Sequence, residues 1–347
     1  MLNFPWMFMI LPLGMRLLHS VKNQFARVVL RRIYLILQTV NGARDRIHLG
    51  TLISIDMSTL LILAGGIGSR YGGDKQISAV GPNGEFLMEY AIYDAIQNDF
   101  KKIVILSSAE FIPCLKKKLS YFSNHISINF VDQYKHDLNH PNYRKKPWGT
   151  AHGVWSCRNK IEGHFLVLNA DDFYGSETFQ IANTFFKESQ THKLGLITFY
   201  LQNTLSHNGP VSRGLCIINK TRLISVTEHT NIASHKMNIT SNECTGKLSG
   251  ETEVSMNCWL LHSNIFNALG NYFQKFHFKY AEDAQAECGL PSFVQSQIEN
   301  GENYTIYTNK SKWFGLTHPA DLEWCRHELK CRVEERSYPK ILSSNYE

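Results

Sequence analysis

The chain has 347 residues, of which 43% are hydrophobic, 19% charged and 12% aromatic. This is the composition of an ordinary globular protein, which excludes a disordered or fibrous chain. Residues 1–56 hold seven Lys or Arg and two Asp, so they carry +5 of the net charge of +6. The nearly neutral remainder lacks the basic surface of a nucleic-acid-binding protein, and we expect no nucleic-acid partner.

The eight cysteines form no C-x-x-C pair and have no zinc-like spacing with histidine. Such cysteines are typical of the reduced thiols of a cytoplasmic protein. We therefore expect a cytoplasmic location.

The N-terminal 56 residues differ from the rest in pattern as well as in charge. The first apolar run is short and broken by prolines, and no basic residue precedes it, so it is a poor membrane span and a poor secretory signal. Residues 16–40 have the pattern of a basic amphipathic helix, and the lack of acids before Asp45 also suits a transit peptide. We favour a third interpretation, in which upstream translation is spurious and the protein begins at Met57. Membrane contact is expected only if residues 1–56 are genuine.

Apolar runs alternate with helical patterns from Leu60 onward. We expect strands at 60–64, 102–106, 127–131, 164–170 and 194–201, and helices near 85–98, 109–120, 150–158 and 177–190. This alternation predicts an α/β fold, a three-layer sandwich with a mostly parallel central sheet covered by helices on both faces.

The pattern changes after residue 201. Residues 213–219 and 223–229 flank a short turn and predict a β-hairpin, and 253–262 predicts another strand. The polar stretch 230–252 is expected to be a mobile loop. Further helices are predicted near 263–275, 290–300 and 319–330, followed by a C-terminal tail at 331–347.

A glycine-rich loop, "AGGIGSRYGGDKQ", follows the first predicted strand and precedes a helix. It matches neither the P-loop pattern nor the dinucleotide fingerprint. Closely spaced glycines expose backbone N–H groups that bind anions, and Arg70 and Lys75 add positive charge. The loop therefore predicts a phosphate site of another kind.

Two further motifs contain polar residues at the ends of predicted elements. In "KPWGTAHGV", Gly149 and Thr150 open a helix whose N–H groups are expected to face a ligand. In "FLVLNADDFYG", a buried strand ends in Asp171 and Asp172, at the edge of an open α/β sheet where ligands bind. Asp is also a favoured N-cap, so a purely structural role for Asp171 stays open.

Taken in order, these motifs resemble those of the sugar-1-phosphate nucleotidyltransferase family, glycosyltransferase-A-like enzymes that form NDP-sugars and pyrophosphate. The uridylyltransferase-like members are the most similar. The resemblance covers most of residues 58–328. It implies a nucleotidyltransferase domain over 57–330 with a nucleotide-diphospho-sugar transferase fold, and a small β-hairpin region that binds sugar.

The resemblance also implies a role for particular residues. The loop residues Gly65, Gly66, Gly68, Ser69 and Arg70 would cradle the NTP phosphates, with Lys75 reaching them. Gln133 would read the base, and Gly149 and Thr150 would lie under the nucleoside. Gly214, Glu228 and Asn257 would face the sugar, and Asp171 would hold Mg²⁺, with Asp172 as its rival.

The chain departs from the family pattern at two positions. The family's "E-K" pair supplies a phosphate-binding lysine, but here Glu228 is followed by His229. The family's late "W-x-D-x-G-T-P" supplies a second metal aspartate, but "WFGLTHP" has Gly315 there. The metal site therefore has one protein carboxylate, or it uses both Asp171 and Asp172.

The expected reaction is transfer of a nucleotidyl group from an NTP, most simply UTP, to a sugar 1-phosphate with Mg²⁺. Two alternatives stay open from the sequence. One is a cytidylyltransferase that acts on phosphocholine or another non-sugar phosphate. The other is a nucleotide-binding regulator that lost turnover together with the second aspartate. The sequence does not fix the oligomeric state.

Overall fold

The computed structural model describes residues 58–66, 75–134, 144, 146–188, 193–235 and 238–346, with the backbone alone for Lys75, His235 and Asn345. The predictions for residues 1–56 and for Gly68, Ser69 and Arg70 lie outside the described residues. Among the helices of the described part, none combines the length and the apolar character that crossing a membrane requires.

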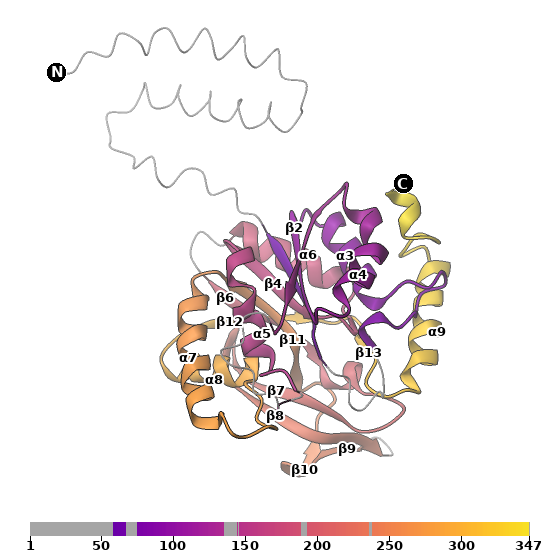
Figure 1. The fold of residues 1–347 in the computed structure, drawn as a ribbon. Coiled ribbons are helices and arrows are strands. Elements are labelled where there is room, and N and C mark those ends of the chain that lie inside the picture. The colour runs from indigo at the N-terminus through magenta and orange to yellow at the C-terminus, as the bar shows by residue number, and fades with distance from the viewer. Residues whose placement is uncertain are drawn as a thin grey trace, which may run out of the picture. The chain divides into compact units, whose positions relative to one another are not determined.

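An 11-stranded sheet runs through the protein in the order β10-β9-β8-β12-β6-β11-β4-β1-β2-β3, with β7 paired to β8 and β11 (Figure 1). Its parallel strands are β1 (Thr59–Ala64), β2 (Lys102–Ser107), β3 (Ser127–Asp132), β4 (His164–Asn169), β6 (Leu194–Tyr200) and β12 (Tyr304–Asn309). β11 (Glu253–His262) runs antiparallel between β4 and β6. The predicted central sheet is confirmed.

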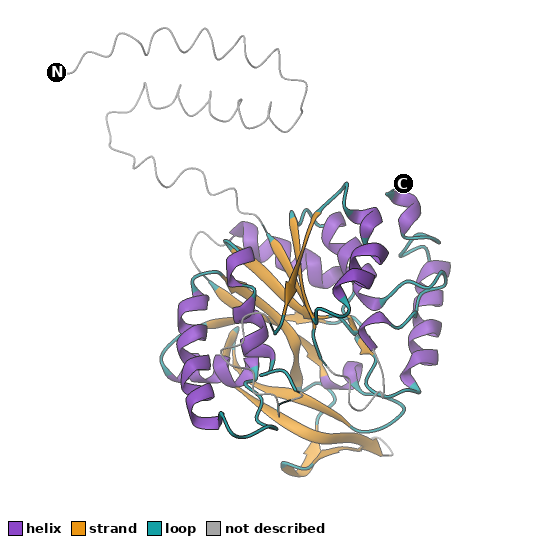
Figure 2. Cartoon of the chain, viewed as in Figure 1, coloured by secondary structure: helices purple, strands orange, loops and turns teal. Residues whose placement is uncertain are grey.

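Helices cover both faces of this sheet (Figure 2). One face packs against α3 (Leu87–Gln97), α4 (Ile112–Lys118) and α6 (Ser176–Glu188). The other packs against α5 (Thr150–Ser156), α7 (Ile265–Tyr280) and α8 (Leu290–Glu299). Because both faces are buried, the strands are continuous apolar runs such as "LLILA", and the predicted three-layer sandwich is confirmed.

The predicted hairpin is formed by β7 (Val211–Asn219) and β8 (Arg222–His235). The prediction of a mobile loop at 230–252 is wrong, because β8 extends into it and β9 (Asn238–Ser241) and β10 (Cys244–Leu248) continue the sheet. The reason is local pairing within a polar stretch. The Thr230 backbone N–H and hydroxyl both donate to the Glu243 carboxylate, at 2.7 and 2.6 Å, and Ile232 is buried beneath.

Besides β9 and β10, the strands β5 (Asp172–Phe173), β12 and β13 (Phe314–Gly315) have no clear signal in the sequence. In β12, buried residues alternate with partly buried ones over the first four positions, and the strand lacks the long apolar run of the other parallel strands. β5 and β13 form a separate two-stranded sheet that joins the aspartate motif to the "WFGLTHP" motif.

The C-terminal segment after α9 (Asp321–Glu334) packs against α3. Tyr338, Leu342 and Tyr346 are buried, and the Tyr338 hydroxyl donates to the Asp94 carboxylate at 2.7 Å. Burial raises the pKa of Asp94 to about 7, although the bond from Tyr338 opposes the shift. The tail therefore covers a buried acid.

We expect Asp94→Asn to flatten the pH dependence of stability. An acid whose pKa is higher in the folded state than in the unfolded state stabilises the fold fully below about pH 4. This contribution is lost as the pH rises from about 4 to about 7. The free energy of unfolding of the wild type should thus fall by about 2–3 kcal/mol more than that of the variant between pH 5 and pH 8. Urea unfolding at both pH values measures this, and Asp99→Asn, at an exposed carboxylate just beyond α3, is the control. Equal slopes for Asp94→Asn and the wild type would contradict the prediction.

Candidate functional site

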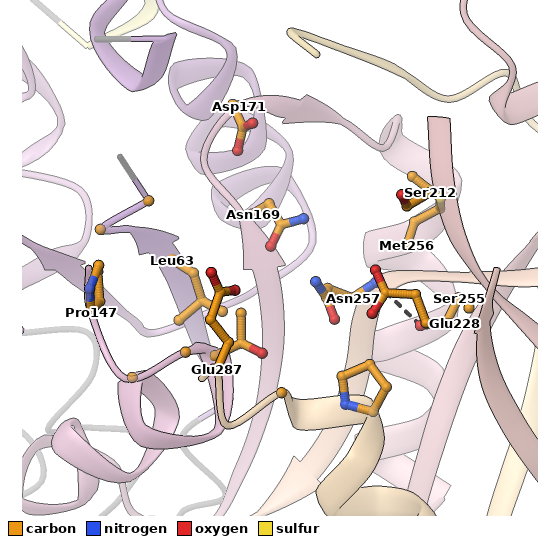
Figure 3. A pocket seen from close by; sticks show the side chains of 18 of the residues that line it. Leu63, Pro147, Asn169, Asp171, Ser212, Glu228, Ser255, Met256, Asn257 and Glu287 are labelled. Carbon is orange, nitrogen blue, oxygen red and sulfur yellow. Dashed lines mark hydrogen bonds between the residues drawn. The ribbon is translucent and has the colours of Figure 1, made fainter. Parts of the chain in front are cut away.

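A cavity of about 790 Å³ opens at the carboxyl ends of β1, β3 and β4 (Figure 3). Among the residues that line it are Gly65, Gly66, Gln133, Gly149, Thr150, Asp171, Asp172, Gly214, Glu228 and Asn257. All of these residues were proposed from sequence as parts of the site. Each proposed site residue with a described side chain or glycine backbone therefore lines the same cavity. Gly68, Ser69, Arg70 and the side chain of Lys75 are outside the description, so their roles stay predictions.

Gln133 lies against the start of the glycine loop. Its amide Nε2 donates to the Gly65 carbonyl at 3.0 Å, and the side chain is only 5% exposed. A Cβ at position 65 would overlap the Gln133 amide. Gln76, which the sequence analysis did not single out, donates to the Gly66 carbonyl. Two glutamine side chains thus hold the loop where it leaves β1.

The turn before α5 is clamped by a distant segment. Gly149 has φ +102°, and a Cβ there would lie 2.6–2.9 Å from backbone atoms of Cys288. The Ala151 N–H donates to the Cys288 carbonyl at 2.9 Å, and the Thr150 hydroxyl accepts from Leu290 N–H at 2.8 Å. At least one N–H at the start of α5 is therefore used within the fold, in contrast to the expectation that these groups face a ligand.

The segment that contains Cys288 makes further contacts with the residues before α5, and the sequence did not indicate these residues as part of the site. Arg144 donates to the carbonyls of Asp283 and Ala286 and lies over the Trp148 ring at 3.7 Å. Lys146 pairs with Glu287 at 3.4 Å, and both line the cavity. Except for the Arg144–Trp148 contact, these pairs are about 140 residues apart, so no local motif signals them.

The two aspartates after β4 have different surroundings. Asp172 is 6% exposed, and its Oδ2 accepts from Asn169 Nδ2 at 2.8 Å and lies 3.1 Å from the Tyr174 hydroxyl. Asp171 is half-buried on the cavity wall, and its backbone carbonyl accepts from Leu316 N–H at 3.0 Å. Asp171 is thus the more accessible carboxylate.

Gly315 lies directly opposite Asp172 in the β5–β13 pair. A Cβ at position 315 would overlap Asp172 Oδ1 and lie 2.9 Å from the Asp171 carbonyl oxygen. An aspartate at 315 therefore does not fit beside the Asp172 carboxylate in this arrangement. The departure from the family pattern has a steric basis.

The available donors suit magnesium. Within the described ranges, no group of three or more His, Cys, Asp or Glu side chains is arranged to hold a metal. Mg²⁺ usually keeps several waters and takes one or two carboxylates together with substrate phosphates. Asp171, with Asp172 beside it, fits that requirement.

Another wall of the cavity is formed by three paired strands. Gly214 on β7 faces Glu228 on β8 and Ser255 on β11. Asn257 has φ +57° where the register of β11 with β6 shifts, and its Oδ1 accepts from Trp259 Nε1 at 3.3 Å. Glu228 and Asn257 both line the cavity on this wall and are labelled in Figure 3.

His229 does not replace the missing lysine. Its Nδ1 lies 2.9 Å from Ser241 Oγ on β9 and 3.9 Å from Glu243, away from the residues that line the cavity. A positive group that does lie on this wall is Arg213, which no sequence motif indicated. It is buried, lies over the Trp313 ring at 4.6 Å, and donates to the Ser212 carbonyl at 2.8 Å.

The sequence model of the nucleotidyl transferase family matches residues 59–316. The chain belongs to this family. The "Bifunctional protein GlmU" of Methanococcus vannielii is 30% identical over 100 residues, a match that spans 29% of this chain and 20% of that protein.

Solved structures of nucleotidyltransferases share the fold. The inositol-1-phosphate CTP transferase from T. maritima has a TM-score of 0.56 at 15% identity and covers 81% of this chain and 97% of its own. A putative glucose-1-phosphate thymidylyltransferase from Bacillus anthracis has a TM-score of 0.55 at 15% identity, covering 79% and 95%. The CTP:phosphocholine cytidylyltransferase LicC from Streptococcus pneumoniae has 0.52 at 12% identity, covering 79% and 99%. These likenesses confirm the nucleotidyltransferase fold.

We expect Gly65→Ala to weaken nucleoside triphosphate binding by about tenfold or more, because the new methyl group displaces the Gln133 amide. Calorimetric titration with UTP measures the change. In a Gln133→Ala background the space is open, so adding Gly65→Ala should change the affinity little further. Additive losses in the double variant would show that Gly65 acts independently of Gln133.

Proposed function

We propose that this nucleotidyl transferase moves a nucleotidyl group from an NTP, with UTP as the first candidate, to a sugar 1-phosphate, and that it uses Mg²⁺. The observation that supports the proposal is one cavity of about 790 Å³, which is lined by the described residues among the nucleotide, metal and sugar positions inferred from sequence. A cytoplasmic location and a domain over 57–330 remain part of the same proposal.

The reaction requires placement and neutralisation of charge. An acceptor phosphate oxygen forms a bond to the α-phosphorus of the NTP, the bond from that phosphorus to the bridging oxygen breaks, and pyrophosphate leaves with the electron pair. The glycine loop, Arg70 and Lys75 are proposed to hold the triphosphate in line with the acceptor. Mg²⁺ bound at Asp171 would neutralise the phosphate charge.

The β7–β8–β11 wall provides groups suited to an acceptor. Glu228, Asn257 and Ser212 offer carboxylate, amide and hydroxyl groups that can bond sugar hydroxyls. Arg213 supplies positive charge on the same wall. The opposite side, with Gln133, Lys146 and Glu287, is the proposed place of the nucleoside.

A second candidate is a cytidylyltransferase that acts on phosphocholine or another non-sugar phosphate. The observation that favours it is the exposed carboxylate of Glu228 on the acceptor wall, which suits a positively charged headgroup. The structures from T. maritima and S. pneumoniae are named as enzymes that use CTP.

Pyrophosphate release, measured over a grid of NTPs and acceptor phosphates, tests the proposal. We expect turnover with UTP and a hexose 1-phosphate, and a loss of about 10²–10³-fold in folded Lys75→Ala, which removes charge at the reacting phosphates. Lys117→Ala, at an exposed lysine on α4 that is not among the residues lining the cavity, is the matched control. Turnover only with CTP and a non-sugar phosphate would establish the second candidate. No turnover with any pair would leave a nucleotide-binding regulator.

The two aspartates should differ in their effect. We expect Asp171→Asn to abolish turnover with little loss of stability, because its carboxylate is the accessible one, and Asp172→Asn to be milder. Turnover of both variants across a Mg²⁺ titration, with thermal unfolding in parallel, measures this. A dead Asp172→Asn beside a normal Asp171→Asn would mean that the metal carboxylate is Asp172.

A further inference from the structure

The Tyr174 hydroxyl joins two residues that line the cavity, Asn169 and Met256. The residue is 2% exposed and follows β5 in the "DDFYG" stretch. Its hydroxyl oxygen accepts from the Asn169 backbone N–H at 3.1 Å, and the O–H donates to the Met256 carbonyl at 2.8 Å. Asp172 Oδ2 is 3.1 Å away. One oxygen atom thus contacts the end of β4, the aspartate pair and β11.

This contact replaces missing backbone pairing. β4 and β11 pair from His164–His262 to Val167–Trp259, and the pairing then stops. Continued in the same register, Asn169 on β4 would face Asn257 on β11, and both are labelled in Figure 3. Instead the bulge at Asn257 carries β11 away, and the Tyr174 hydroxyl bridges Asn169 N–H and the Met256 carbonyl.

The bridge is a neutral phenol. Burial raises the pKa of Tyr174 well above its usual value, with the nearby Asp172 carboxylate adding to the shift. A phenol has a single proton to donate. The Met256 carbonyl, at the shorter distance, is its main acceptor, and Asp172 keeps its bond from Asn169 Nδ2.

We propose that Tyr174 is a positioning residue for nucleotidyl transfer, and that its hydroxyl fixes the acceptor wall at Ser255–Asn257 relative to the carboxylates at Asp171 and Asp172. The role in transfer rests on the proposed function, whereas the mechanical link does not. Loss of the hydroxyl leaves the Asn169 N–H and the Met256 carbonyl without this partner, and both residues line the cavity. The strand then relaxes at the bulge, and the acceptor moves relative to the NTP. Small misplacements of this kind cost large factors in rate.

Tyr174→Phe tests the proposal, with Tyr338→Phe as the matched control. Tyr338 is also a buried tyrosine whose hydroxyl lies by a carboxylate, Asp94, but it lies away from the residues that line the cavity. In Tyr174→Phe we expect the KM of the acceptor phosphate to rise about tenfold or more, with the KM of the NTP changed less than about twofold. Tyr338→Phe should lower the melting temperature comparably and leave both KM values unchanged.

Hydrogen exchange of the whole chain, read on peptides that cover 253–262, tests the mechanical link without any turnover. We expect faster exchange there in Tyr174→Phe and not in Tyr338→Phe. Asp172→Asn is a second variant in case Tyr174→Phe does not fold. It keeps the bond from Tyr174 to Met256, so exchange at the bulge should stay as in the wild type.

Unchanged exchange at the bulge in Tyr174→Phe, or faster exchange in Asp172→Asn, would overturn the mechanical link. Faster exchange in Tyr174→Phe with an unchanged acceptor KM would overturn the positioning role. If the wild type releases no pyrophosphate with any substrate pair, the proposed function and the positioning role fail together. The exchange result then still decides whether the link exists.

Discussion

The position of the cavity depends on one constraint, the burial of the parallel strands on both faces of the sheet. The side chains of β1, β2 and β4 are almost all buried, so the polar groups that these strands offer to the cavity come from the end of each strand and the residues that follow it. Because parallel strands end at the same edge, those residues meet there, and the cavity forms where the glycine loop, Gln133 and Asp171 converge. The antiparallel β11 closes this edge with the bulge at Asn257.

Close approach of distant groups to glycine shapes each part of this edge. Position 65 lies against Gln133, position 149 against the Cys288 backbone, and position 315 against Asp172. In each case the missing Cβ makes room for a group from another segment. These glycines are therefore required for packing within the site as well as for any contact with phosphate, and phosphate binding alone does not account for them.

The sequence predicts well what is local and apolar. The buried parallel strands and the helices between them were found because each is a long run with a single periodicity. The clamp of Leu290 on Thr150 and the bond of Tyr338 to Asp94 join residues 140 and 244 apart, and no local pattern reports such pairs. The ribbon at 230–248 was missed because its strands are polar and mostly exposed, and their pairing depends on cross-strand bonds such as Thr230 to Glu243.

The two departures from the family pattern are opposite in charge. Gly315 stands where the family has a metal-binding aspartate, and His229 stands where it has a phosphate-binding lysine. An added carboxylate at 315 would clash with Asp172, and His229 faces the β9 strand instead of the cavity. Arg213 is a positive group on the wall formed by β7, β8 and β11. Loss of the second aspartate does not by itself indicate loss of turnover, because Mg²⁺ usually takes only one or two protein carboxylates and completes its coordination with waters and substrate phosphates.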